Sequence, residues 1–134
     1  DTFERARPLL RSGLRRLLDT GTVFTNAYHE HAVPDTCPGH ASISTGTHPQ
    51  RSGIVANDWF DHSSGKEQYC VGNNKRAVSA AFLKTPALAD WIKAADPESK
   101  VFAVSGKDRG AVLLAGKEAD GAFWFSKDLG EFTT

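Results

Sequence analysis

A hydroxyl group just ahead of a potential helix start is the feature of this sequence best suited to chemistry. Thr36 lies in the run 35–40, two residues before Pro38, and small and apolar residues follow over 41–46. Proline is favoured at the start of a helix, so the run predicts a short helix here. Thr36 would then lie at a helix N-terminus, where free N–H groups and the helix dipole favour a phosphate-like anion. Taken alone, the run favours an ordinary helix cap over a nucleophile.

Two further positions supply groups that suit such an anion. Asn57 follows Thr36 by 21 residues, and Lys107 and Arg109 form a Lys-x-Arg pair later in the chain. An arginine can grip two oxygens at once, while a lysine acts as a point charge. The pair alone would favour a solvated turn.

Helices and strands alternate along the sequence. Leucines at helical spacing predict a helix over 10–18, and β-branched and aromatic residues predict a strand over 22–28. A helix with one apolar stripe is predicted over 85–95, and a buried strand of the parallel type over 100–105. Two further apolar stretches lie at 111–116 and 121–125. This alternation predicts an α/β fold with a mostly parallel sheet.

The predicted strands place the chemical groups at one edge. Ligands of parallel sheets bind where the strands end. Thr36 follows the first predicted strand, and Lys107 and Arg109 follow the second, so we expect them at the same edge. Residues 46–74, which carry Asn57, show no clear periodicity and are interpreted as irregular.

Composition sets broad limits. The 134 residues are 40% hydrophobic and 24% charged, with 16 basic and 16 acidic side chains, which is typical of one soluble domain. Zero net charge gives no reason to expect a nucleic-acid surface, and no apolar run is long enough for a membrane span. The three tryptophans are expected in the core. Cys37 and Cys70 are expected to be unpaired and partly buried, because their spacing indicates no pairing.

In their order and spacing, the motifs resemble the alkaline phosphatase superfamily, in its branch of type I phosphodiesterases and nucleotide pyrophosphatases. Within that branch they are most similar to the bacterial alkaline phosphatases with a threonine nucleophile. The matching stretches are 15–18, 21–27, 36–41, 53–60, 107–109 and 121–125. The resemblance implies a three-layer α/β/α sandwich with a mostly parallel central sheet. Residues 1–134, which do not begin with Met, are then expected to be the N-terminal part of a single catalytic domain.

The resemblance also implies a role for each candidate residue. Thr36 would be the nucleophile, would form a phosphothreonine intermediate and would also ligate metal. Asn57 would donate to a phosphoryl oxygen, and Lys107 and Arg109 would contact the others and favour monoesters. The implied activity is metal-dependent hydrolysis of small-molecule phosphate monoesters by a periplasmic or secreted enzyme. Two zinc ions are implied, with most of their ligands outside this segment.

Three other interpretations stay open. A phosphodiesterase or nucleotide pyrophosphatase of the same superfamily would share the nucleophile, but the Lys-x-Arg pair argues against it. A non-catalytic homologue would bind phosphorylated ligands without turnover, and a purely structural fragment would do neither. The oligomeric state is not predicted.

Three groups of histidines are weaker candidates. Asp58 with His62, and His29 with His31, have spacings that occur in metal sites. We interpret both as solvated groups. His40 is expected to fix the turn after Thr36.

Overall fold

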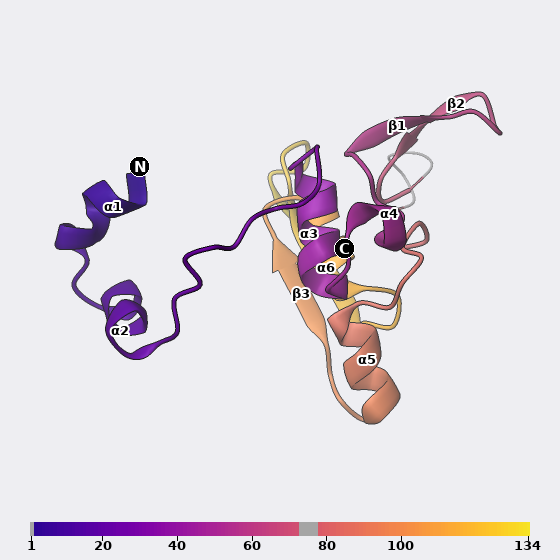
Figure 1. Ribbon diagram of the computed structural model, residues 1–134. Helices are drawn as coiled ribbons and strands as arrows, with labels where there is room; N and C mark the ends of the chain where they lie inside the picture. Colours follow the sequence, from indigo (N-terminus) through magenta and orange to yellow (C-terminus); the bar gives the residue numbers. More distant parts are fainter. Residues whose placement is uncertain (1, 73–77) are drawn as a thin grey trace.

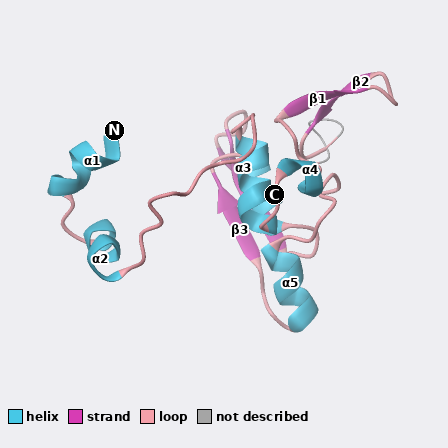
Figure 2. Ribbon diagram, in the orientation of Figure 1, coloured by secondary structure: helices cyan, strands magenta, loops and turns pink. Residues whose placement is uncertain are grey.

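The computed structural model describes residues 2–72 and 78–134, which form a body and an N-terminal arm (Figure 1). The arm holds α1 (Thr2–Ala6), a 3-10 helix (Arg7–Leu9) and α2 (Gly13–Thr20). The helices of the body are α3 (Thr36–Thr45), α4 (Pro49–Ser52), α5 (Leu88–Ala95) and α6 (Asp108–Ala115). Its strands are β1 (Asp58–Asp61), β2 (Lys66–Tyr69), β3 (Phe102–Ser105), β4 (Gly121–Ser126) and β5 (Glu131–Thr133), of which Figure 2 labels the first three.

The body is layered. In the three-stranded sheet, β3 pairs with β4 in parallel, with Val104 opposite Phe123, and β5 pairs with β4 antiparallel, with Phe125 opposite Phe132. Helix α6 packs on β3 and β4, and α3 packs on α6. Strands β1 and β2 form a separate antiparallel hairpin that projects from the body (Figure 1). The molecule therefore combines helices with a mixed sheet, as an α/β fold requires.

The core lies between the helices and the loops that follow the hairpin. Its fully buried large side chains include Ile54, Val71, Leu83 and Leu113. Trp59 and Trp124 pack against this core, as predicted for tryptophans. Helix α5 confirms the helix predicted over 85–95, but its apolar stripe faces solvent in this structure. Trp91 on that stripe is 60% exposed, so its predicted place in the core is wrong.

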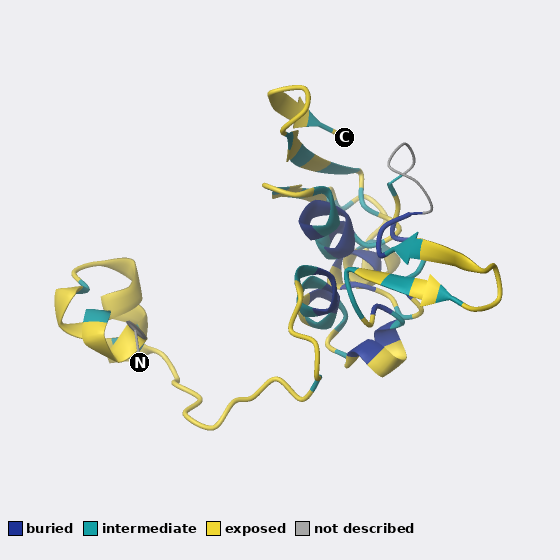
Figure 3. Ribbon diagram, turned by 90° about the horizontal axis from the view of Figure 1, so that it is seen from above, coloured by how far each residue is buried: buried dark blue, intermediate teal, exposed yellow. Residues whose placement is uncertain are grey.

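The strand predicted over 22–28 does not form. Residues 21–30 are exposed and run as an extended link between α2 and α3 (Figure 3). Phe24 and Tyr28 are each 80% exposed. A strand needs a neighbour for its N–H and C=O groups, and no described segment pairs with this one. Residue types that suit a strand do not form one without that neighbour.

Two other predictions on strands need correction. Strand β3 confirms the parallel strand predicted over 100–105, but it is not buried on both sides, since Phe102 and Val104 are exposed. The region 46–74 is less irregular than predicted, because β1 and β2 form a hairpin within it. Charged residues alternate poorly with apolar ones there, so the period-2 signal of a strand is weak. Among the described residues, no helix is long and apolar enough to cross a bilayer.

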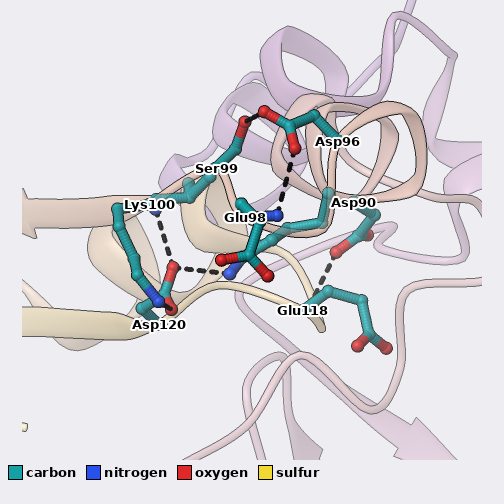
Figure 4. Close-up of polar contacts among 9 residues, drawn as sticks. Asp90, Asp96, Glu98, Ser99, Lys100, Glu118 and Asp120 are labelled. Atoms are coloured by element: carbon teal, nitrogen blue, oxygen red, sulfur yellow. Dashed lines mark hydrogen bonds and ion pairs between the residues drawn. The ribbon is translucent and has the colours of Figure 1, made fainter.

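Two carboxylates fix the frame around α5 (Figure 4). The buried Asp90 accepts N–H groups with both oxygens: Oδ2 from Ala87 at 2.7 Å, and Oδ1 from Lys117 at 2.8 Å and Glu118 at 2.9 Å. It thereby joins the start of α5 to the turn after α6. Gly116 in that turn has a φ of +74°, and a Cβ there would come within 2.6 Å of Asp90 Oδ1. The close approach therefore requires glycine.

Asp120 links two segments at the start of the sheet in a similar way. It pairs with Lys93 at 2.8 Å and Lys100 at 3.4 Å, and it accepts the N–H of Val101 at 2.8 Å (Figure 4). The hydrogen bond from Lys93, followed by that from Val101, holds the pKa of Asp120 well below its usual range. The carboxylate therefore stays charged and ties the entry of β3 to the residue before β4.

Replacing Asp90 tests its part in the frame. We expect Asp90→Ala to lower the free energy of unfolding of the full-length protein by about 2–4 kcal/mol, because it leaves three N–H groups without their acceptor. The matched control is Asp96→Ala, which removes an exposed carboxylate that accepts from Glu98 and Ser99. That change should cost about 0.5 kcal/mol. Equal losses in denaturant titrations of both variants would contradict the role of Asp90.

Candidate functional site

The N-terminus of α3 presents Thr36. The helix begins at Thr36, and the preceding Asp35 is extended, so the predicted place of the hydroxyl at a helix N-terminus is confirmed. Pro38 occupies the third helical position rather than the first, still within the turn where a helix does not need its N–H. Gly39 donates to the carbonyl of Asp35 at 3.0 Å. His40 Nδ1 lies 2.7 Å from the carbonyl oxygen of Thr36, in keeping with its expected part in the turn.

Asn57 is held against the same helix turn. The backbone N–H of Cys37 donates to Asn57 Oδ1 at 2.9 Å. Because an N–H group can only donate, the side-chain atom that it meets must be the amide oxygen. The amide nitrogen of Asn57, with its two protons, is therefore left to face another acceptor. The structure thus brings Asn57 beside Thr36, and it frees the donor that a phosphoryl oxygen would need.

A disulfide joins Cys37 and Cys70, and both residues are fully buried. The expectation that they are unpaired and partly buried is wrong. The N–H of Cys70 donates to the backbone carbonyl of Asn57 at 2.9 Å, so both half-cystines donate to the same asparagine. The pairing is long-range, with a sequence separation of 33, and no local pattern in the sequence signals it.

Lys107 and Arg109 lie at the start of α6. Lys107 is the residue before the helix and is exposed, while Arg109 is the second helical residue and is half-buried. The next residue, Gly110, lies against α3: a Cβ there would be 3.4 Å from His40 Nε2 and would clash with Ser105. The first turns of α3 and α6 are therefore neighbours. This packing brings the segment that holds Thr36 close to the segment that holds Lys107 and Arg109, as predicted.

A tyrosine that the sequence did not single out holds Arg109. Arg109 Nη1 donates to the hydroxyl of Tyr69 at 2.9 Å, and its guanidinium carbon lies 5.9 Å from the centre of the tyrosine ring. The Tyr69 hydroxyl lies 2.8 and 3.0 Å from the carboxylate oxygens of Asp108. Burial is the main cause that raises the pKa of Tyr69, and the hydrogen bond with Tyr69 raises the pKa of Arg109. The phenol thus stays protonated and the guanidinium stays charged.

The histidine candidates do not gather into a metal site. The exposed His29 and the half-buried His31 stack edge to face with ring centres 5.4 Å apart, and His62 stacks on Phe60 at 5.2 Å. His48 pairs with Glu30 at 3.1 Å. Within residues 2–72 and 78–134, no group of three or more His, Cys, Asp or Glu side chains is placed to hold a metal ion.

The fold and the site together define an α/β domain in which a hydroxyl at the N-terminus of one helix lies near the start of a second helix that carries two cationic residues. The chain belongs to the type I phosphodiesterase / nucleotide pyrophosphatase family, whose model matches residues 1–133.

Several relatives of the chain are named alkaline phosphatases. The chain is 39% identical to alkaline phosphatase PhoK of Sphingomonas sp, over 97% of this chain and 25% of the relative. It is 41% identical to alkaline phosphatase PhoD of Zymomonas mobilis, over 96% of this chain and 24% of the relative. It therefore spans about a quarter of the length of these relatives.

Solved structures agree on the fold. The crystal structure of alkaline phosphatase PafA matches 90% of this chain and 25% of its own, with a TM-score of 0.81 and 36% identity. PafA is a protein of Elizabethkingia meningoseptica. A PafA variant with a threonine, an asparagine, a lysine and an arginine replaced matches with a TM-score of 0.82 and 32% identity, over 90% of this chain and 26% of its own.

The hydrogen bond from the Cys37 N–H to Asn57 Oδ1 can be tested through the free energy of unfolding of the protein. Asn57→Ala removes the acceptor of the Cys37 N–H, and we expect it to lower the free energy of unfolding by about 1–3 kcal/mol. Asn57→Asp keeps an acceptor oxygen at a helix N-terminus, where a negative charge is favourable, and should cost less. Denaturant titration of the full-length variants measures both. A larger loss for Asn57→Asp than for Asn57→Ala would contradict the assigned amide orientation.

Proposed function

We propose that the protein is an alkaline phosphatase-type phosphoric monoester hydrolase that works through a phosphothreonine at Thr36. The observation that carries the proposal is the hydrogen bond from Cys37 to Asn57 Oδ1, because it sets an amide donor beside the hydroxyl at the start of α3. The neighbouring start of α6 supplies Lys107 and Arg109. The names of the relatives support the same activity.

The reaction needs two displacements at phosphorus. In the first, Thr36 Oγ forms a bond to phosphorus and the bond to the leaving oxygen breaks, which releases the alcohol. In the second, water attacks the same phosphorus and releases inorganic phosphate, which restores Thr36. Asn57 Nδ2 donates to one phosphoryl oxygen, and Lys107 and Arg109 neutralise charge on the others. A monoester carries one more negative charge than a diester, so it gains more from these two cations.

The threonine needs help to ionise. Two zinc ions, when bound, would supply the Lewis-acid chemistry that lowers the pKa of such a hydroxyl. Thr36 fits a ligand role: its side chain is half-buried, and its hydroxyl forms no hydrogen bond within the described part of the chain. The helix dipole favours the alkoxide at this position. Thr36 is the one metal ligand that we assign within these residues, and the others would come from the rest of the protein.

The PafA variant supports the choice of residues. Its four replaced residues have the types and order of Thr36, Asn57, Lys107 and Arg109. Two of the separations also agree, with 21 residues from threonine to asparagine and 2 from lysine to arginine, whereas the step from asparagine to lysine is 62 residues in the PafA variant and 50 here.

We also propose a periplasmic or secreted location. The buried disulfide between Cys37 and Cys70 supports it, because structural disulfides persist mainly in oxidising compartments.

A phosphodiesterase or nucleotide pyrophosphatase is the second candidate function, since the family model carries both of those names. The two activities differ in how far they use the cationic pair. A non-catalytic binder of phosphate esters would keep the pair and lose turnover.

The first test compares substrates. With zinc supplied to the full-length enzyme, we expect an aryl phosphate monoester to have a higher kcat/KM than the matching methyl diester. Lys107→Ala/Arg109→Ala should lower the monoester value by about 100-fold or more and leave the diester value within about tenfold. The control, Arg5→Ala/Lys117→Ala, removes two exposed cations, one on the N-terminal arm and one after the end of α6 that lies opposite Lys107 and Arg109. A diester preference in the wild type would favour the phosphodiesterase, and an unchanged preference in the double variant would refute the role of the pair.

The second test concerns the nucleophile. Acid quenching during turnover should trap a phosphate on the peptide that contains Thr36, and mass spectrometry should find it there. Thr36→Ala should lose the adduct and at least about 10³-fold in kcat, while Thr36→Ser should keep the adduct on the new hydroxyl. Full activity of Thr36→Ala would refute the covalent mechanism.

A further inference from the structure

We infer that Tyr69 is a positioning residue that orients Arg109 for a doubly charged phosphoryl group. The inference rests on the proposed function. Tyr69 ends β2 and reaches Arg109 at the start of α6, 40 residues later in the chain. It joins the hairpin to the start of α6 through hydrogen bonds of its hydroxyl and through the contact of its ring with the guanidinium.

The direction of each hydrogen bond at this hydroxyl is fixed by its partners. Arg109 can only donate, so Tyr69 accepts from Nη1 at 2.9 Å. The carboxylate of Asp108 can only accept, so Tyr69 donates its proton there, at 2.8 and 3.0 Å. The raised pKa of the phenol keeps that proton in place. Phenylalanine could do neither, although it would keep the ring.

This contact leaves one edge of the guanidinium available. Nη1 is occupied by Tyr69, whereas Nε of Arg109 is buried and has no hydrogen-bond partner among the described residues. Nε and Nη2 form the edge that binds two oxygens side by side. The ring of Tyr69, 5.9 Å from the guanidinium carbon, restrains the plane of the group. Arg109 is therefore held with Nε unpaired on that edge, and a phosphoryl oxygen that accepts from Nε must take the place of the atoms that now cover it.

Tyr69 also keeps Arg109 away from its neighbouring acid. Asp108 precedes Arg109, and an acid so close would attract the guanidinium into an ion pair. Its carboxylate instead accepts the Tyr69 hydroxyl and the backbone N–H of Arg109, the latter at 2.8 Å. Without the hydroxyl, Asp108 and the guanidinium are free to pair directly. The cation would then be turned away from the substrate.

A double-mutant cycle tests this role in the full-length enzyme with zinc. We expect Tyr69→Phe to lower the monoester kcat/KM about tenfold and to change the diester value less than about twofold. In the Arg109→Ala background the same change should have no further effect, because its target is gone. Tyr28→Phe is the matched control, since Tyr28 is 80% exposed on the link before α3.

Binding of inorganic phosphate provides a readout that needs no turnover. Calorimetry should show weaker binding in Tyr69→Phe by a similar factor, and again no further loss in the Arg109→Ala background. Equal losses for monoester and diester, or an equal loss with and without Arg109, would overturn the inference and leave Tyr69 a structural residue. So would an unchanged Tyr69→Phe enzyme. Failure of the proposed function looks different: wild-type enzyme without monoester turnover refutes the hydrolase, while the phosphate-binding cycle still decides the role of Tyr69.

Discussion

The contact of the first turn of α3 with the end of β2 is the constraint on which the site depends. Asn57 accepts N–H groups from both cysteines of the disulfide, once with its side chain and once with its backbone. The residue before Cys37 is the proposed nucleophile, and the residue before Cys70 holds Arg109. Three distant segments are thereby brought to one place by a few buried polar contacts. Buried N–H groups that find acceptors are costly to disturb, which makes this junction a rigid one.

The local parts of this arrangement could be predicted from the sequence. The proline after Thr36 and the apolar stripe of α5 are short-range signals, and both helices form where they were expected. The strand over 22–28 failed because strand formation depends on a neighbour that no local pattern reveals. The disulfide and the contact of Tyr69 with Arg109 were missed for the same reason, since each joins residues 33 or more positions apart. The candidate residues came from motif order, while their orientation needed the structure.

The acidic side chains of Asp90, Asp108 and Asp120 stabilise the fold, and none of them is assigned a part in the reaction. Asp90 and Asp120 satisfy backbone N–H groups around α5 and the sheet, which fixes where α6 ends and where β4 begins. Asp108 is the acid nearest to the cationic pair, and its charge is taken up by Tyr69 and by a backbone N–H. Asp108 is therefore hydrogen-bonded beside Lys107 and Arg109, whereas Asp90 contacts the turn after α6, at the opposite end of that helix.

The disulfide has a further consequence for the unfolded chain. It closes a loop of 33 positions that contains Asn57. In the chain-entropy description, the entropy lost by closing a loop of that size raises the free energy of the unfolded state by about 4 kcal/mol. Asn57 lies inside that loop and Thr36 directly precedes it, so the disulfide limits how far the two residues can separate even when every helix has melted. Residues that are far apart along the sequence are closer together along the path that runs through the disulfide. We therefore expect the contacts around Thr36 and Asn57 to form faster during refolding of the oxidised chain than of the reduced chain, because the disulfide shortens the path between these residues.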